Sequence, residues 1–473
     1  MSLETFVIFC YLGVTLYIGL SRNGKIKNIS DYALGGRNFS TAALVATITA
    51  TYVSGGAFAT TLSRVYSDGI SYLISSSGVA FSLLITAFLF VPKMQRFLGK
   101  TSLAEAMGDS YGKEVRVIVA VCGTVGGSIG SIAVQYTAFG SVLAHFSGIS
   151  NSVAIIIVGV VVTVYSAMGG VRAVTFTDVF QSFTFCLGLP MVGLMIWSHL
   201  YSGSFDLSLA LSEPKFSILH ALDFHQPSFW EVIPLFFCFS IPAMYPADFQ
   251  RVSMGSSISQ TKKAWAISAC IVLAIKMVIS WIPFLVFSVN PNLEKQQVLG
   301  FVLDNYAYGW MRIVLILGIM AMAMSTADSK MNSSAVLFSN DLCRPFGMNE
   351  KYELRAATWF SFMVGAFSIL LAIAVKDLLD MMLFANAFYV PIVFPSLCLM
   401  IFGVRIAKAP VLIGMAAGLT FVVIWKYLAI STDPIVFATL VNLVFMLTSH
   451  YLLGIGKNLS SLDNGDLLES KKT

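Results

Sequence analysis

Four hydroxyl residues recur along an apolar stretch near residues 310–338. They are spaced three and four residues apart, the spacing that places side chains on one face of an α-helix, and they are Ser325, Thr326, Ser329 and Ser333. Hydroxyl oxygens are suitable ligands for hard cations. The face therefore indicates either a Na⁺ site or close packing of small residues against a second helix.

Two charged residues, Asp328 and Lys330, lie on the same stretch. Charges inside a membrane span are costly, so they mark either a functional site or a structural ion pair with another helix. The two residues point to different sides because they are two positions apart. Lys330 follows Thr326 by four residues and shares its face.

Two further stretches combine helix-breaking residues with polar groups. Residues 47–56 read Thr-Ile-Thr-Ala-Thr-Tyr-Val-Ser-Gly-Gly, and residues 239–248 contain Pro242 and Pro246. Paired glycines weaken a helix and prolines remove donors from it. The first stretch is either an unwound segment whose carbonyls bind a cation or a small-residue packing surface. A pair of interrupted helices in corresponding halves indicates a transporter of inverted repeats with its site at the midplane.

A fourth motif, at 165–181, reads Tyr-Ser-Ala-Met-Gly-Gly-Val-Arg-Ala-Val-Thr-Phe-Thr-Asp-Val-Phe-Gln. The Gly-Gly pair predicts a tight turn, with Arg172 at the inner surface and Asp178 opening the next helix. Asp178 either complements that helix N-terminus or faces an inner cavity and handles a cation.

The composition decides what kind of molecule carries these groups. Of its 473 residues 57% are apolar and only 11% charged, with a mean hydropathy of +0.81, whereas soluble domains are about 25% charged. A soluble enzyme, a nucleic-acid binder and a disordered scaffold are excluded, and the absence of a nucleophile–base pair or metal cluster predicts that the chain is not an enzyme. The chain is a polytopic, all-α membrane protein.

Continuous apolar runs of about 20 residues predict transmembrane helices. We expect thirteen, at 4–21, 41–60, 68–92, 116–147, 152–168, 175–200, 228–247, 264–289, 310–338, 356–375, 380–403, 409–428 and 433–453. Most lysines and arginines, Arg251 among them, fall in the odd-numbered gaps and the tail. The positive-inside rule therefore places the N-terminus outside and the C-terminal tail, 454–473, in the cytoplasm. The short loops favour a bacterial inner membrane, and we expect a monomer with no nucleic-acid partner.

Three motifs resemble the solute:sodium symporter family. They are the 165–181 stretch, Asp-Tyr-Ala-Leu-Gly-Gly-Arg at 31–37, and Met-Ser-Thr-Ala-Asp-Ser at 324–329. The proline and pantothenate symporters look like the nearest bacterial branches. The resemblance covers almost the whole chain as a single domain, 1–473. It implies a five-plus-five inverted-repeat core like that of the neurotransmitter:sodium symporters, with repeats at about 41–200 and 228–403 and additional helices at 4–21 and 409–453.

The resemblance also implies ligands. Na⁺ would be bound by the carbonyls of Ala50, Val53 and Met322 and the hydroxyls of Ser325 and Thr326. A second cation site, present in some members, would use Asp178, Asp328 and Ser329, with Asp178 also on the inner release route. Location near the two interrupted helices suggests Tyr52, Ser54, Gly56, Gln135 and Tyr245 as solute contacts.

Two positions depart from the family pattern. Tyr52 stands where the proline branch carries a carboxylate, which argues against simple proline specificity. Lys330 stands where the family usually has an uncharged residue, so its ammonium is expected to stand in for Na⁺, or to be displaced by it, with weakened, lost or proton-based coupling. The alternative is that Lys330 extends to inner water.

We therefore expect a secondary active transporter that moves a small organic solute, an amino acid, carboxylate or vitamin, inward with Na⁺ as the coupling ion. The alternatives are a membrane sensor that binds solute without net transport, and a proton-coupled or Na⁺-independent transporter.

Overall fold

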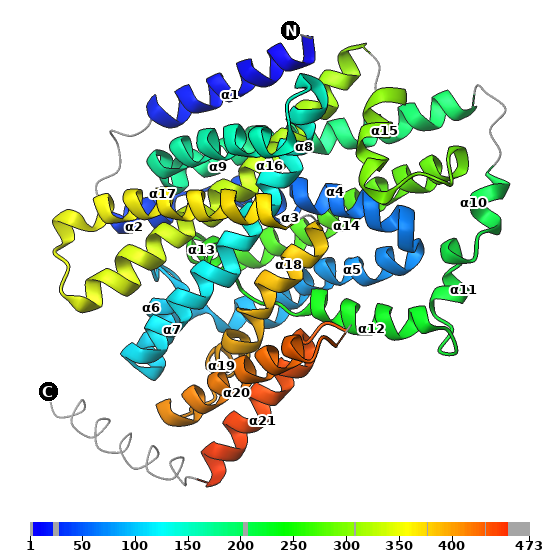
Figure 1. Ribbon diagram of the computed structural model, residues 1–473. Helices are drawn as coiled ribbons and strands as arrows, with labels where there is room; N and C mark the ends of the chain where they lie inside the picture. Colours follow the sequence, from blue (N-terminus) through cyan, green and yellow to red (C-terminus); the bar gives the residue numbers. More distant parts are fainter. Residues whose placement is uncertain are drawn as a thin grey trace, which may run out of the picture.

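The structure is almost entirely helical. A computed structural model describes residues 3–21, 28–201, 207–306, 309–375, 377–430 and 432–452, and every regular element in those ranges is a helix (Figure 1). The first nine α-helices are α1 (Leu3–Ser21), α2 (Ile29–Leu34), α3 (Thr41–Tyr52), α4 (Gly55–Asp68), α5 (Ile70–Ile85), α6 (Leu103–Tyr111), α7 (Lys113–Thr124), α8 (Gly130–Ser147) and α9 (Asn151–Tyr201).

The second part of the chain continues with twelve α-helices. They are α10 (Ser208–Ser212), α11 (Ile218–Ala221), α12 (Pro227–Ser240), α13 (Pro246–Ser253), α14 (Ile258–Val289), α15 (Val298–Asn305), α16 (Gly309–Val336), α17 (Glu350–Ala374), α18 (Leu378–Ala387), α19 (Val390–Ile401), α20 (Lys408–Tyr427) and α21 (Ile435–Leu452). A π-helical turn, Val125–Ile129, joins α7 to α8, so the two helices form one long span.

The described residues contain eight helices that are long and apolar enough to cross a membrane, or ten if two bent pairs each count as one span. Each of the thirteen predicted spans overlaps a helix or a broken helix. The difference in number arises because several predicted spans are interrupted or short, such as α12. Thirteen crossings and the five-plus-five repeat stay predictions, and the predicted cytoplasmic tail lies outside the described residues.

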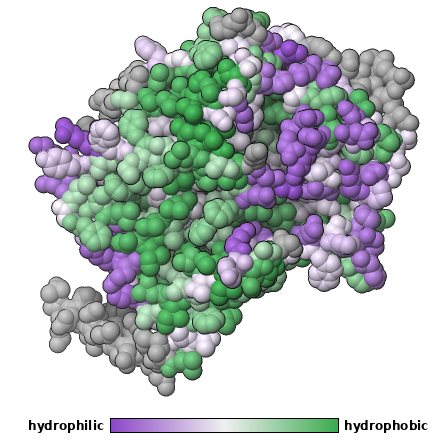
Figure 2. All heavy atoms as spheres, viewed as in Figure 1, coloured by the Kyte–Doolittle hydropathy of each residue, from purple (hydrophilic) through white to green (hydrophobic). Residues whose placement is uncertain are grey.

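The outer surface of the helix bundle is suited to lipid. Large apolar side chains are exposed along the outer helices, among them Phe367 on α17 and Phe445 on α21. Figure 2 shows a broad hydrophobic surface across one face, with hydrophilic residues gathered at two opposite sides. In water such an exposed apolar surface would favour aggregation, whereas in a bilayer it would contact the hydrocarbon core.

Three helices are broken, of which two were predicted. Helices α3 and α4 meet at 47°, and Ser54 caps the N-terminus of α4, where its side chain accepts a hydrogen bond from the Ala57 backbone N–H. Helices α12 and α13 are separated by residues 241–245, and Pro246 opens α13, where a missing N–H costs nothing. The third break, of 52° between α18 and α19, was not predicted.

Helix α9 covers two predicted spans, 152–168 and 175–200. The chain bends between them at Gly170, where φ is 59° and ψ is 175°, a conformation that only glycine adopts without strain. The predicted Gly-Gly turn is thus present as a sharp kink at Gly170, which divides α9 into two helical segments. Between α9 and α12, the described residues 207–226 contain the short helices α10 and α11.

Helix α16 lies at the centre of the bundle. Of its most apolar stretch 83% is buried, against 22–61% for the other seven candidate spans. It packs against α3, α4, α8 and α9. The hydroxyl face of the 310–338 stretch is therefore surrounded by protein on several sides.

Candidate functional site

Four of the five predicted Na⁺ ligands converge where α16 passes the break between α3 and α4. The Ser325 hydroxyl lies 3.2 Å from the Ala50 carbonyl oxygen and 3.1 Å from that of Met322. The Thr326 hydroxyl lies 3.2 Å from each of the same two carbonyl oxygens. Four neutral oxygens from two helices thus meet in one buried place.

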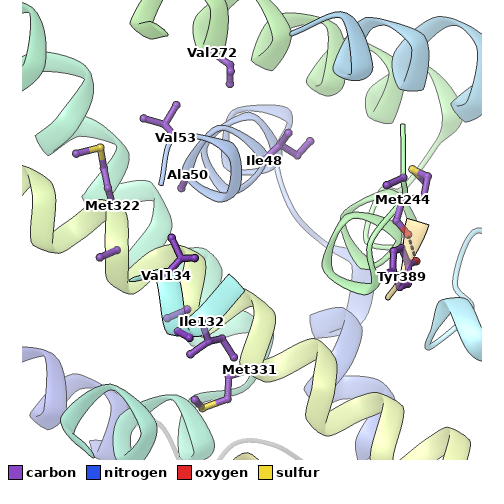
Figure 3. Close-up of a cluster of buried hydrophobic side chains, with 14 of the residues drawn as sticks. Ile48, Ala50, Val53, Ile132, Val134, Met244, Val272, Met322, Met331 and Tyr389 are labelled. Atoms are coloured by element: carbon purple, nitrogen blue, oxygen red, sulfur yellow. Dashed lines mark hydrogen bonds between the residues drawn. The ribbon is translucent and has the colours of Figure 1, made fainter. Parts of the chain in front are cut away.

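Val53, the fifth predicted ligand, lies at the break itself. It ends α3 with φ −90° and ψ 75°, so the helical backbone stops there. Figure 3 shows Ala50 and Val53 at the end of α3, beside Met322 on α16. The close approach depends on Gly55, because a Cβ there would lie 2.8 Å from the Ala323 Cβ, closer than real side chains come.

A cavity of about 170 Å³ adjoins this cluster of oxygens. Four of the five predicted solute contacts line it: Tyr52, Ser54, Gln135 and Tyr245. Thr326 also lines it, so the cavity and the oxygen cluster share a side chain. The predicted solute contacts are therefore brought together from α3, α8 and the α12–α13 break.

Gly56, the fifth predicted solute contact, is the exception in this group. It does not line the cavity, and a Cβ at this position would lie 2.2 Å from Val134 Cγ1. Its backbone N–H donates to Gln135 Oε1 at 2.9 Å. Gly56 thus lets α4 approach α8 and orients the Gln135 amide, which is a packing and positioning role.

Lys330 lines the same cavity instead of extending to inner water. Its side chain is 6% exposed, and Nζ lies 4.4 Å from the centroid of the Tyr245 ring. The snorkelling alternative is therefore wrong. The ring holds the ammonium in the cavity because an aromatic face attracts a cation.

The predicted second cation site is arranged differently from the expectation. Arg251 of α13, buried to 1% exposure, lies between two of its members: it donates to the Ser329 hydroxyl and lies 3.7 Å from Asp178 Oδ2. Asp178 Oδ2 also accepts a hydrogen bond from Thr47 at 2.5 Å. A resident guanidinium thus occupies the place between Asp178 and Ser329.

Asp328 is not part of that group. Its Oδ1 accepts a hydrogen bond from Ser166 on α9, while its other oxygen is buried without a partner in the described part of the chain. The three residues predicted to bind a second cation therefore do not surround a common position. Arg251, counted from the sequence among the inner-side loop cations, is in fact a buried member of the site region.

Three comparisons with known proteins bear on this arrangement. The Sodium:solute symporter family matches residues 32–418, most of the chain.

The chain belongs to the sodium:solute symporter family.

Membership makes it a Na⁺-coupled symporter of small organic solutes and a multi-pass membrane protein.

Individual relatives in the sodium:solute symporter family are distant in sequence. The chain is 23% identical to the human high affinity choline transporter 1 over 84% of this chain and 72% of that protein. It is 24% identical to the sodium/sialic acid symporter SiaT of Proteus mirabilis over 78% and 77% of the two chains. A solved structure of a Na⁺-coupled sialic acid symporter, substrate-bound and outward-open, superposes with a TM-score of 0.82 at 20% identity, covering 96% and 98% of the two chains.

The structure places further residues at the candidate site of this symporter that the sequence analysis did not assign. Asp248 and Asn386 line the cavity. Tyr389 stacks on Tyr245 at 4.8 Å between ring centroids and donates to the Met244 carbonyl oxygen at 2.9 Å, the bond drawn in Figure 3. Pro391, at the start of α19, was the sequence signal that could have found the third break and these neighbours.

Proposed function

We propose that this symporter moves a small organic solute into the cell, with one Na⁺ bound by the Ala50, Val53 and Met322 carbonyls and the Ser325 and Thr326 hydroxyls. The observation that carries the proposal is the meeting of those two hydroxyls with the Ala50 and Met322 carbonyl oxygens at 3.1–3.2 Å. The solute would bind in the adjoining cavity.

The chemistry of the oxygens favours an alkali cation. Carbonyl and hydroxyl oxygens are hard, neutral donors, so they replace part of an ion's hydration shell without holding it by opposite charge. A monovalent ion bound in this way is able to leave again, which a transport cycle requires. Because Thr326 belongs to both the oxygen cluster and the cavity wall, ion and solute would each bind better in the presence of the other.

Alternating access would then follow from where the ligands come from. Ala50 lies on α3 and the two hydroxyls on α16, so an ion between them favours the conformation in which these helices touch. In a cell whose interior is negative, each positive charge moved inward gains about 2.3 kcal/mol per 100 mV. This gain drives accumulation of the solute, for which an amino acid, a carboxylate and a vitamin are the candidate classes.

The finer organisation is part of the same proposal. The N-terminus would be outside and the C-terminal tail, 454–473, cytoplasmic, in a bacterial inner membrane. Repeats at about 41–200 and 228–403 would form the moving core, with helices at 4–21 and 409–453 added to it. The basic residues between predicted spans support this orientation, and the broken helices α3–α4 and α12–α13 at corresponding places support the repeat. We propose a monomer as the working unit.

The experiment is ion binding by the purified protein and ion movement by the reconstituted one. Apparent melting temperature is measured in NaCl and in KCl, and radioactive Na⁺ influx into liposomes is measured with a solute panel outside. We expect Na⁺ alone to raise the melting temperature, and Thr326→Val to abolish that rise. Thr358→Val, which removes a hydroxyl on α17 that donates only to its own helix, is the matched control and should retain it.

The same experiment separates the alternatives. A melting temperature indifferent to Na⁺ in the wild-type protein contradicts the ion site. A solute that stabilises the protein in Na⁺ but drives no Na⁺ influx supports a sensor. The presence of Lys330 in the cavity is the observation that favours proton coupling, and solute uptake driven by a pH gradient without Na⁺ would establish it.

A further inference from the structure

Two opposite charges line the solute cavity. Lys330 on α16 and Asp248 on α13 are 6% and 2% exposed, and both contribute to the cavity wall. They are not in ion-pair contact, although each is near enough to act electrostatically on the other. Asp248 was not assigned any role from the sequence, and Lys330 was expected to act at the ion site.

The two charges differ in how well the protein satisfies them. The Asp248 carboxylate accepts a hydrogen bond from the Tyr245 backbone N–H at 3.1 Å and interacts with the Tyr52 hydroxyl. The Lys330 ammonium carries three donors, yet none of them has an acceptor in the described part of the chain, and its only recorded contact is the Tyr245 ring. A buried ionic donor without an acceptor is costly. The Lys330 ammonium in the cavity therefore lacks a hydrogen-bond acceptor.

We propose that the Lys330 ammonium binds a carboxylate group of the transported solute. This rests on the proposed function, since it names the chemical class of solute for the same cavity. A carboxylate supplies the charged acceptor that the ammonium lacks, and such charge-assisted hydrogen bonds are the strong ones. The neutral amides of Gln135 and Asn386 line the same cavity and face the rest of the solute.

A quaternary ammonium solute fits this cavity poorly. Such a cation is normally bound against aromatic faces. The Tyr245 ring already contacts Lys330 and stacks on Tyr389, which leaves only the rings of Tyr52 and Phe239 among the described lining residues for such a cation. A cationic head would in addition meet the Lys330 charge. The cavity therefore distinguishes this chain from a relative that is named for choline.

The same charges explain why ion and solute would be taken up together. With Lys330 and Asp248 both ionised, the unloaded cavity is neutral. A bound carboxylate adds a negative charge, and a Na⁺ at the neighbouring oxygen cluster balances it. Because Thr326 lies in both places, the two bound charges attract each other in a buried environment, where electrostatic interactions are strong.

The test uses the full-length protein and pairs of probes that differ in the carboxylate. The pairs are betaine and choline, pantothenate and panthenol, and L-proline and L-prolinamide, each titrated in NaCl while the apparent melting temperature is recorded. We expect at least one acid to stabilise the protein and its partner without the carboxylate to fail. A panel in which no acid exceeds its partner overturns the proposal.

Variants then assign the effect to Lys330. Lys330→Gln should weaken binding of the stabilising acid about tenfold to a hundredfold and leave the stabilisation by Na⁺ alone unchanged. Lys276→Gln is the matched control, because Lys276 lies within α14 and does not line the cavity; it should change neither. If Lys330→Gln keeps acid binding and strengthens the response to Na⁺, Lys330 acts at the ion site and the proposal is wrong. Loss of the Na⁺ response in the wild-type protein would instead contradict the ion site and leave the carboxylate result standing.

Discussion

Two buried cationic side chains on neighbouring helices have different surroundings. Arg251 on α13 donates to Ser329 and lies 3.7 Å from Asp178, so its charge is compensated by the protein. Lys330 on α16 lies against the Tyr245 ring in the cavity, and no carboxylate is in ion-pair contact with it in the described part of the chain. Neither cation has all of its donors satisfied, since Arg251 Nε and Nη1 are also buried without a hydrogen-bond partner among the described residues. The two cations differ because Arg251 has a carboxylate beside it, whereas Lys330 faces the candidate solute cavity.

The largest effect that would test this comparison is expected at Arg251. Arg251→Met removes one partner of a buried pair and leaves Asp178 uncompensated, which should cost about 3–5 kcal/mol of stability. Apparent melting temperature in detergent, without solute, is the measurement. Arg172→Met, at an arginine that is 59% exposed and pairs with Asp31, is the control and should change it little. A mild effect of Arg251→Met would contradict the structural role given to this guanidinium.

A smaller effect is expected at Lys330. Lys330→Met relieves a buried ammonium that lacks an acceptor but also removes its attraction to Asp248. Because these effects oppose each other, stability without solute should change by only about 1 kcal/mol or less. The same melting assay measures it, in parallel with Arg251→Met. Equal destabilisation by the two substitutions would show that the two cations are alike after all.

The smallest effect is expected where charges are paired at the protein surface. Asp377, which precedes α18, contacts Arg64 and Lys295, both at 3.2 Å, and caps α18 through hydrogen bonds from two backbone N–H groups. Asp377→Asn keeps a good cap and removes the ion pairs, so it should cost about 0.5 kcal/mol. Asp377→Ala removes the cap as well and should cost about 1 kcal/mol more. Equal losses for the two variants would show that the charge rather than the cap matters.

The pH dependence of this pair has a definite sign. Burial raises the pKa of the Asp377 carboxyl, but the Asp380 backbone N–H and the charges of Arg64 and Lys295 outweigh it and hold the pKa below its ordinary value. Such a group contributes stability above its unfolded pKa of about 3.9 and loses it as the pH falls through the folded pKa. The stability difference between the wild-type protein and Asp377→Asn should therefore be constant near neutral pH, begin to fall near the unfolded pKa of about 3.9, and vanish only below the folded pKa. A difference that persists in acid would contradict the ionic origin.

The oxygen cluster could be anticipated from the sequence because each of its two segments carries a local signal. Ser325 and Thr326 are adjacent on one helix, and the Gly-Gly pair after Ser54 marks the break that brings α3 to them. The family motifs supplied the register between the two segments. Each of the thirteen predicted spans has a helical counterpart because apolar runs of that length are unambiguous.

The parts that were missed depend on contacts between distant segments. The direction of the Lys330 side chain is set by Tyr245, 85 residues away in sequence (330 − 245), so the sequence left two alternatives open. Arg251 resembled a loop cation because its partners, Asp178 and Ser329, lie on other helices. Gly56 appeared to be a solute contact because spacing alone does not show that Val134 occupies the space beside it.

Because the oxygen cluster is divided between α3 and α16, a Na⁺ bound there would act as a reversible cross-link between the two helices. A ligand that binds only the folded, closed arrangement adds about 1.4 kcal/mol to its stability for every tenfold rise in concentration above the dissociation constant. Sodium is abundant outside a cell and scarce inside it. Bound Na⁺ would thus hold the two helices together when the site faces the medium, and its release would let them separate when the site faces the cytoplasm. The protein would therefore be more rigid in the outward-facing state than in the inward-facing state.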